Sequence, residues 1–83
     1  MSVTAYSAVP TVNLKKTGEN IKRIRKEAGV SVKDLQTVIG FSSPQAIYSW
    51  QNGSYLPTVD NLIILAAVLG TTLDEIVAVD VPT

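Results

Sequence analysis

The stretch SVKDLQTVIGFSSPQAIYSWQNG, residues 31–53, decides the fold because it holds two short helical patterns on either side of a glycine turn. Ser31 and Asp34 have the spacing of a capping box, which predicts a helix that begins at Ser31 and runs to the next glycine. A second helix is predicted over 44–52, since Ser43 can cap it and proline is favoured at the first helical position. The stretch therefore predicts two helices joined by a tight turn.

The two sides of the predicted helix 44–52 differ in chemistry. At about 100° per residue, one side gathers Ala46, Ile47 and Trp50. The other side carries hydrogen-bonding groups and no formal charge, on Gln45, Tyr48, Ser49 and Asn52. A helix that enters the major groove of DNA needs such donors and acceptors, and glutamine is the natural bidentate partner of adenine. The alternative is an ordinary neutral surface helix.

Three further helical patterns surround this pair. They cover about 17–28, with Thr17 as the cap, then 58–70, capped by Thr58 after a proline, and then a short helix from a second capping box at Thr72. The apolar positions of the four helices outside 44–52 are, in order, Ile21, Ile24 and Ala28; Val32, Leu35, Val38 and Ile39; Val59, Leu62, Leu65, Ala66 and Leu69; Leu73, Ile76 and Val77. The pattern predicts an all-α, five-helix domain over residues 15–78, with an arm over 1–14 and a tail over 79–83.

The two ends of the chain show a different pattern. The arm is uncharged and contains Val9, Val12 and Leu14, while the alternation over 77–81 is typical of a strand. We therefore consider short strands at the termini that pair with each other. The helix over 58–70 is apolar nearly all round, with Ile64, Ala67 and Val68 outside its expected core face. Such a helix is normally covered on both sides, either by a second subunit, which we favour, or by the arm.

Composition narrows the function. The chain has 83 residues, which predicts one small domain. It contains no cysteine and no histidine, so we expect no disulfide, no metal and no cofactor. We also expect no enzyme activity, because histidine, the usual general base, is missing. It has no basic leader and no apolar run near the roughly 20 residues of a membrane span, so we expect a cytoplasmic protein. Net charge is zero, yet all seven basic residues lie between positions 15 and 33. This basic end either attracts phosphate or is a solvated helix face.

Residues 18–77 resemble the Xre-type helix-turn-helix family, which includes Cro and the phage repressors. The matching pieces are GENIKRIRKEAGVSVKDL, VIGF, AIYSWQNG and LPTVDNLIILAAVLGTTLDEI. The resemblance implies a repressor-like fold in which the helices over 31–40 and 44–52 form the helix-turn-helix. It also implies a sequence-specific transcriptional regulator, a repressor, that binds double-stranded DNA. The homodimer that we favour from the helix over 58–70 would bind a palindromic operator.

The resemblance also implies roles for individual residues. Base contacts are expected from Gln45 and Ser49, with Tyr48 and Pro44 next. Phosphate contacts are expected from Ser43, Asn52, Gly53, Ser54 and Lys33. Support for the helix is expected from Arg25, Gln51, Ile47 and Trp50. The family commonly pairs an arginine with a glutamate where this chain has Arg25 and Gln51, so a charge-assisted hydrogen bond replaces an ion pair.

The sequence differs from the family pattern at three places. Val32 stands where the family usually has a phosphate-contacting glutamine, Gln36 stands where it has a small residue, and one extra residue lies between Gly40 and Ile47. Two other functions stay open. One is an antitoxin that binds DNA and a protein partner. The other is a helical protein-interaction module without DNA binding, which zero net charge and Val32 favour and the polar side of helix 44–52 opposes.

Overall fold

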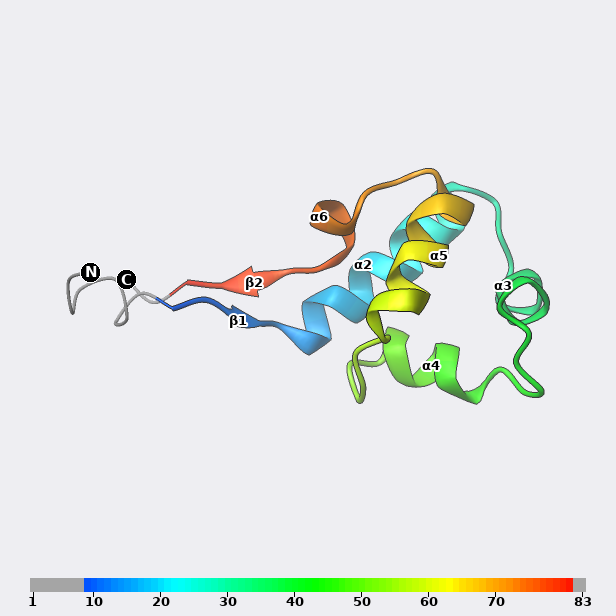
Figure 1. The fold of residues 1–83 in the computed structure, drawn as a ribbon, viewed down its shortest axis with the longest axis horizontal. Helices are drawn as coiled ribbons and strands as arrows, with labels where there is room; N and C mark the ends of the chain where they lie inside the picture. The colour runs from blue at the N-terminus through cyan, green and yellow to red at the C-terminus, as the bar shows by residue number, and fades with distance from the viewer. Residues whose placement is uncertain (1–8, 82–83) are drawn as a thin grey trace.

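The computed structural model describes residues 9–81 and contains, over that range, five helices and two short strands. Their order is β1 (Thr11–Val12), α2 (Leu14–Glu27), α3 (Val32–Ile39), α4 (Gln45–Gln51), α5 (Val59–Leu69), α6 (Leu73–Ile76) and β2 (Val79–Asp80). The helices gather into one body, and the two strands project from it as a ribbon (Figure 1). The five-helix prediction is confirmed. No helix in this range is long and apolar enough to cross a membrane.

All five helices contribute to one apolar core. Its buried side chains are Ile21, Ile24, Leu35, Ile47, Trp50, Leu62, Leu65, Leu69 and Ile76. Phe41, in the turn after α3, packs edge-on against Trp50 with the ring centroids 5.7 Å apart. Four residues that the periodicity placed on core faces are exposed, namely Ala28, Val38, Val59 and Leu73. Ala28 is the C-cap of α2, and Val59 belongs to a helix so apolar that the periodicity does not single out its buried side.

Side-chain caps define where most helices begin. The Asp34 N–H donates to Ser31 Oγ at 3.0 Å, and the Ser31 N–H donates back to the Asp34 carboxylate at 3.1 Å, as the capping-box spacing predicts. Thr58 and Thr72 cap α5 and α6 by accepting from the backbone three residues later. The second box is only half formed, since the Glu75 carboxylate accepts from the Thr71 hydroxyl instead.

Two predicted helix starts are wrong. Helix α2 begins three residues before Thr17, at Leu14, because the Asn13 side chain accepts from the Lys16 N–H at 2.9 Å and caps it. Ser43 does not cap α4: the residue before that helix is Pro44, and no side-chain hydrogen bond forms there. Ser43 therefore lies one residue before the N-cap position.

The strands at the two ends pair as antiparallel neighbours, Thr11 opposite Asp80 and Val12 opposite Val79. At the base of the ribbon the Asn13 N–H donates to the Ala78 carbonyl at 2.8 Å. The ribbon leaves the helical body beside the start of α2 and points away from α5 (Figure 1). The expectation of short strands at the termini is therefore confirmed. The residues of the arm from Val9 onward lie in this ribbon and do not cover α5.

Candidate nucleic-acid interface

The turn between α3 and α4 is built around Gln36. Gly40 ends α3 in the left-handed region, with φ +86°, and allows the chain to reverse. The backbone N–H groups of Gly40 and Phe41 both donate to the Gln36 carbonyl at 3.0 Å, and the Gln36 side chain donates to the Phe41 carbonyl at 3.3 Å. Gln36 thus braces the longer turn from both ends, a role that the sequence pattern did not suggest.

Helix α4 is anchored on one side and open on the other. Ile47 and Trp50 are buried, and Ala46 is half-buried beside them. Gln45 and Tyr48 are exposed, while Ser49 and Pro44 are half-buried. The same face continues to Asn52, which is exposed just beyond the helix. The structure therefore places the four expected base-contacting side chains next to one another on a surface that carries no formal charge.

Close backbone contact fixes α4 against α2. The Cα of Gly18 lies so near the end of α4 that a Cβ on it would be 2.6 Å from the Gln51 carbonyl oxygen and still closer to that of Trp50. Only glycine allows this approach. Arg25 adds two hydrogen bonds: its Nε donates to Gln51 Oε1 at 2.9 Å, and its Nη1 donates to the Val30 carbonyl at 3.0 Å. The expected Arg25 and Gln51 pair is thus formed, with a neutral acceptor.

The turn after α4 uses most of its polar groups internally. Asn52 Oδ1 accepts from the Ser54 N–H at 3.1 Å and from the Ser54 hydroxyl at 2.7 Å. The N–H of Gly53 donates to the Trp50 carbonyl, and Gly53 packs on the backbone of Lys15, where a Cβ would come within 2.8 Å of the Lys15 Cα. The amides of Gly53 and Ser54 are therefore engaged, whereas the Asn52 amide nitrogen makes no hydrogen bond within residues 9–81.

Charged side chains gather on one side of α2. With 3.6 residues per turn, Lys15, Lys22 and Lys26 share a side of that helix with Glu19. The ion pair between Arg23 and Glu27, at 3.5 Å, lies roughly 90° further around the helix, and both of its side chains are exposed. Lys33 and Ser43, also expected at phosphates, are exposed on α3 and in the turn before α4.

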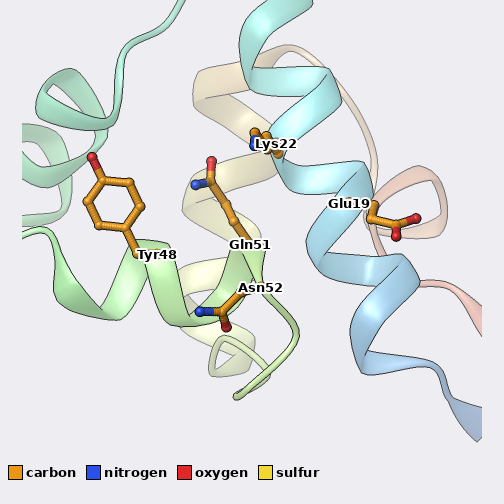
Figure 2. Close-up of a pocket in the computed structure, with 5 residues that line it drawn as sticks. All are labelled: Glu19, Lys22, Tyr48, Gln51 and Asn52. Carbon is orange, nitrogen blue, oxygen red and sulfur yellow. The ribbon is translucent and has the colours of Figure 1, made fainter.

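A shallow hollow lies between α2 and α4, with a volume of about 340 Å³. Figure 2 shows its lining residues, Glu19 and Lys22 from α2 and Tyr48, Gln51 and Asn52 from α4 and the residue after it. Four of the five carry hydrogen-bond donors, so this hollow and the outer face of α4 form one continuous polar surface.

Comparison with known proteins identifies the architecture. A helix-turn-helix family model matches residues 21–76. Among solved structures, the DNA-binding domain of S. venezulae BldD superposes with a TM-score of 0.65 at 24% identity, covering 78% of this chain and 96% of that chain. The restriction-modification controller protein C.AhdI from Aeromonas hydrophila gives 0.67 at 22% identity, with 76% and 94% covered.

A third structure places the same fold inside a longer chain. Fe(II)-HppE, solved with the alternative substrate (S)-1-HPP, gives a TM-score of 0.68 at 26% identity, but the match covers 82% of this chain and only 34% of that one. No curated protein matches this sequence.

Proposed function

Because the chain belongs to the Xre- and Cro-like helix-turn-helix family, we propose that it is a DNA-binding transcriptional regulator that represses by occupying a specific operator. One observation carries the proposal. Helix α4 presents an uncharged face rich in hydrogen-bonding groups, while Ile47 and Trp50 hold its other side rigidly in the core. A rigid helix with such a face matches the edges of base pairs in the major groove.

The base contacts that we propose come from the exposed side of α4. Gln45 lies in the first turn and can donate to and accept from one adenine, which gives two bonds in a fixed geometry. Ser49 lies one turn further along the same side, with Tyr48 and Pro44 beside them. Sequence preference should therefore concentrate at the bases that face Gln45 and Ser49.

The phosphate contacts that we propose flank this face. Lys33 and Ser43 precede α4, on α3 and in the turn, and the Asn52 amide nitrogen, which makes no hydrogen bond within the described residues 9–81, follows it. Gly53 and Ser54 contribute by holding the turn in shape, since their backbone N–H groups already have acceptors within the protein. Such contacts position the helix without selecting a sequence.

A second copy of the chain is the partner that we propose for α5. Val59, Ile63 and Ala67 are exposed at spacings of four residues and form a stripe along that helix, which we call the α5 stripe. Tyr55 and Leu56, just before the helix, are exposed as well. Of the three residues expected on the outer side, Ala67 is exposed, but Ile64 and Val68 are half-buried, and Ile63 is exposed instead.

A twofold-symmetric dimer formed through the α5 stripe would present two copies of α4 to DNA. An apolar stripe left bare in a small domain marks an interface. A twofold axis through the α5 stripe repeats α4 once in each protomer, and two such helices about 34 Å apart fit successive major grooves of a palindromic site. The names of the compared proteins, a DNA-binding domain and a controller protein, agree with this proposal.

Selection of bound duplexes from a random DNA library tests the proposal with the full chain. We expect enrichment of a palindrome whose half-sites are about one helical turn apart, roughly 10 base pairs. Gel shifts at low and moderate salt then compare the selected duplex with a scrambled one. Equal affinity for the two, or no binding at either salt concentration, contradicts the proposal and leaves the protein-interaction module, which the bare α5 stripe and zero net charge favour.

A further inference from the structure

The ribbon formed by β1 and β2 has one polar and one apolar face. Thr11 lies opposite Asp80, and the Asn13 side-chain amide donates to the Asp80 carboxylate at 3.3 Å, so these polar groups share a face. Because side chains alternate along a strand, the other face is made of valines, which are exposed. We call them the ribbon valines: Val12, Val79 and Val81. The described part of the chain leaves this apolar face uncovered.

Other kinds of partner fit the ribbon poorly. Its polar face carries the Asp80 carboxylate, and neither strand contains a basic residue, so DNA would be repelled. Pro10, next to β1, has no N–H to offer to an added strand. The ribbon valines remain, and with no charge and no hydrogen-bonding side chain they suit an apolar surface.

The start of α5 carries a matching apolar surface. Tyr55 and Val59 are the two most exposed large apolar side chains of the described range, and Leu56 beside them is exposed as well. The ribbon of the same copy does not cover them, because it points away from α5 (Figure 1). The ribbon of a second copy is free of that restriction.

Both surfaces lie at the same level relative to α4. The turn after α4 leads directly into Tyr55, and it also packs on the start of α2, where a Cβ on Gly53 would come within 2.8 Å of the Lys15 Cα. The ribbon joins the helical body at that same start of α2 (Figure 1). A twofold axis that presents both copies of α4 to one duplex points toward the DNA, so each element keeps its height above the duplex. The ribbon of one copy is therefore level with the start of α5 in the other.

We propose that in the dimer each ribbon lays its valines on the start of α5 in the partner, the surface that carries Tyr55, Leu56 and Val59. This contact rests on the proposed function, since it requires the dimer. It is a crossed contact made twice about one axis, and it covers two bare apolar surfaces with each other.

The size of the interface favours the crossed contact. A stable interface buries roughly 1,000 Å² or more. The α5 stripe offers only three side chains in each copy, and at roughly 100 Å² apiece these fall well short. The crossed ribbons add the ribbon valines of both copies and also bury Tyr55 and Leu56. Without the ribbons, those two side chains would stay exposed beside the stripe.

Engineered cysteines locate the contact, because the native chain has none. Full-length Val79→Cys and ¹⁵N-labelled Val59→Cys are mixed in equal amounts and oxidised, and the products are resolved by mass spectrometry. Two cysteines form a disulfide only when their Cα atoms lie within about 7 Å. We expect the mixture to give the mixed disulfide far above the share that random pairing yields. Each variant oxidised alone should stay largely without covalent dimer.

Substitutions on the two faces of the ribbon measure its contribution. Replacing Val12 and Val79 together by threonine keeps the branched side chains that strands favour and removes apolar contact. The dimer dissociation constant, from analytical ultracentrifugation, should rise about tenfold or more. Thr11→Val is the matched control, because Thr11 is also exposed but lies on the polar face. We expect its dissociation constant to equal that of the native chain.

The outcomes separate the ribbon contact from the proposed function. A native chain that sediments as a monomer at every concentration contradicts the proposed dimer itself. If the native chain dimerises, covalent dimer from Val59→Cys alone with no excess of the mixed product places α5 against α5 and overturns the ribbon contact. Covalent dimer from Val79→Cys alone places ribbon against ribbon and overturns it as well. An unchanged dissociation constant in the threonine double variant has the same meaning.

Discussion

The Thr17 hydroxyl accepts a hydrogen bond from the Ala78 backbone N–H at 2.9 Å, across 61 positions of the chain. Thr17 is 1% exposed and is the one polar side chain among the buried residues of the described range. The bond joins the first half of α2 to the segment that leaves α6, so it ties the base of the ribbon to the helical body. A buried hydroxyl with a single long-range partner has structural consequences that can be measured.

Thr17→Val keeps the shape of the side chain and removes this acceptor. The Ala78 N–H then loses its partner, and we expect the free energy of unfolding to fall by about 1–2 kcal/mol. Urea unfolding followed by circular dichroism measures the loss. Thr37→Val is the control, since the Thr37 hydroxyl donates to a carbonyl of its own helix at the surface. Equal losses in the two variants would show that the long-range bond has no special role.

Gln45→Ala tests base recognition. We expect affinity for the selected duplex to fall by about 1–3 kcal/mol and the preference at one half-site position to relax. Affinity for a scrambled duplex should stay the same, because phosphate contacts are unchanged. Titration of both duplexes, followed by a repeated library selection with the variant, gives the two readouts. An equal fall on both duplexes assigns Gln45 to general affinity rather than to recognition.

Ile63→Glu tests the α5 stripe. Ile63 is 54% exposed, so the fold should tolerate the change, but a charge forced into an apolar interface should weaken association by about tenfold or more. Analytical ultracentrifugation over the micromolar range compares the variant with the native chain. Val38→Glu is the matched control, because Val38 is 58% exposed on α3. A native chain that sediments as a monomer at every concentration rejects the dimer.

The Asp34 carboxylate, part of the capping box at the start of α3, makes the stability of the fold depend on pH. The Ser31 backbone N–H, and then the Ser31 hydroxyl, lower the pKa of this carboxyl from its ordinary value of 3.8 by hydrogen bonding to it. A lowered pKa means that Asp34 stabilises the fold above its unfolded pKa, and that this contribution is lost as pH falls through the folded pKa. The carboxyl shift of Asp34, titrated by NMR, should show the low pKa. Ser31→Ala should raise this pKa, and an unchanged titration would show that the Ser31 hydroxyl does not contribute to lowering it.

Much of the fold follows from local sequence. The boxes and caps at Ser31, Thr58 and Thr72 set helix starts through bonds that span three residues, so a short window contains all the information. The division of α4 into a buried and an open side also follows from local periodicity, since Ile47 and Trp50 recur at helical spacing. These features depend on neighbours in sequence.

Other features depend on partners far along the chain. Threonine often caps helices, but Thr17 lies inside α2 because Asn13 is the N-cap of that helix. The Thr17 hydroxyl instead accepts a hydrogen bond from the distant Ala78 N–H. No local pattern contains that pairing. The predicted exposed side of α5 is right for Ala67 but wrong for Ile64 and Val68, because a helix with aliphatic residues on every side gives periodicity little to discriminate. The hollow beside Lys22 likewise exists only once α2 and α4 pack together.

The ribbon determines how the domain bears mechanical load. Because β1 and β2 are antiparallel and leave the body together, tension applied between Val9 and Val81 opens them like a zipper, one rung at a time. Each rung resists alone, so the ribbon should part at low force. The force then acts on the hydrogen bonds that Ala78 makes with Asn13 and Thr17. These two bonds are the last to break before α2 and α6 are pulled directly. The helical body that contains α4 therefore bears no tension from the chain ends until the hydrogen bonds of Ala78 break.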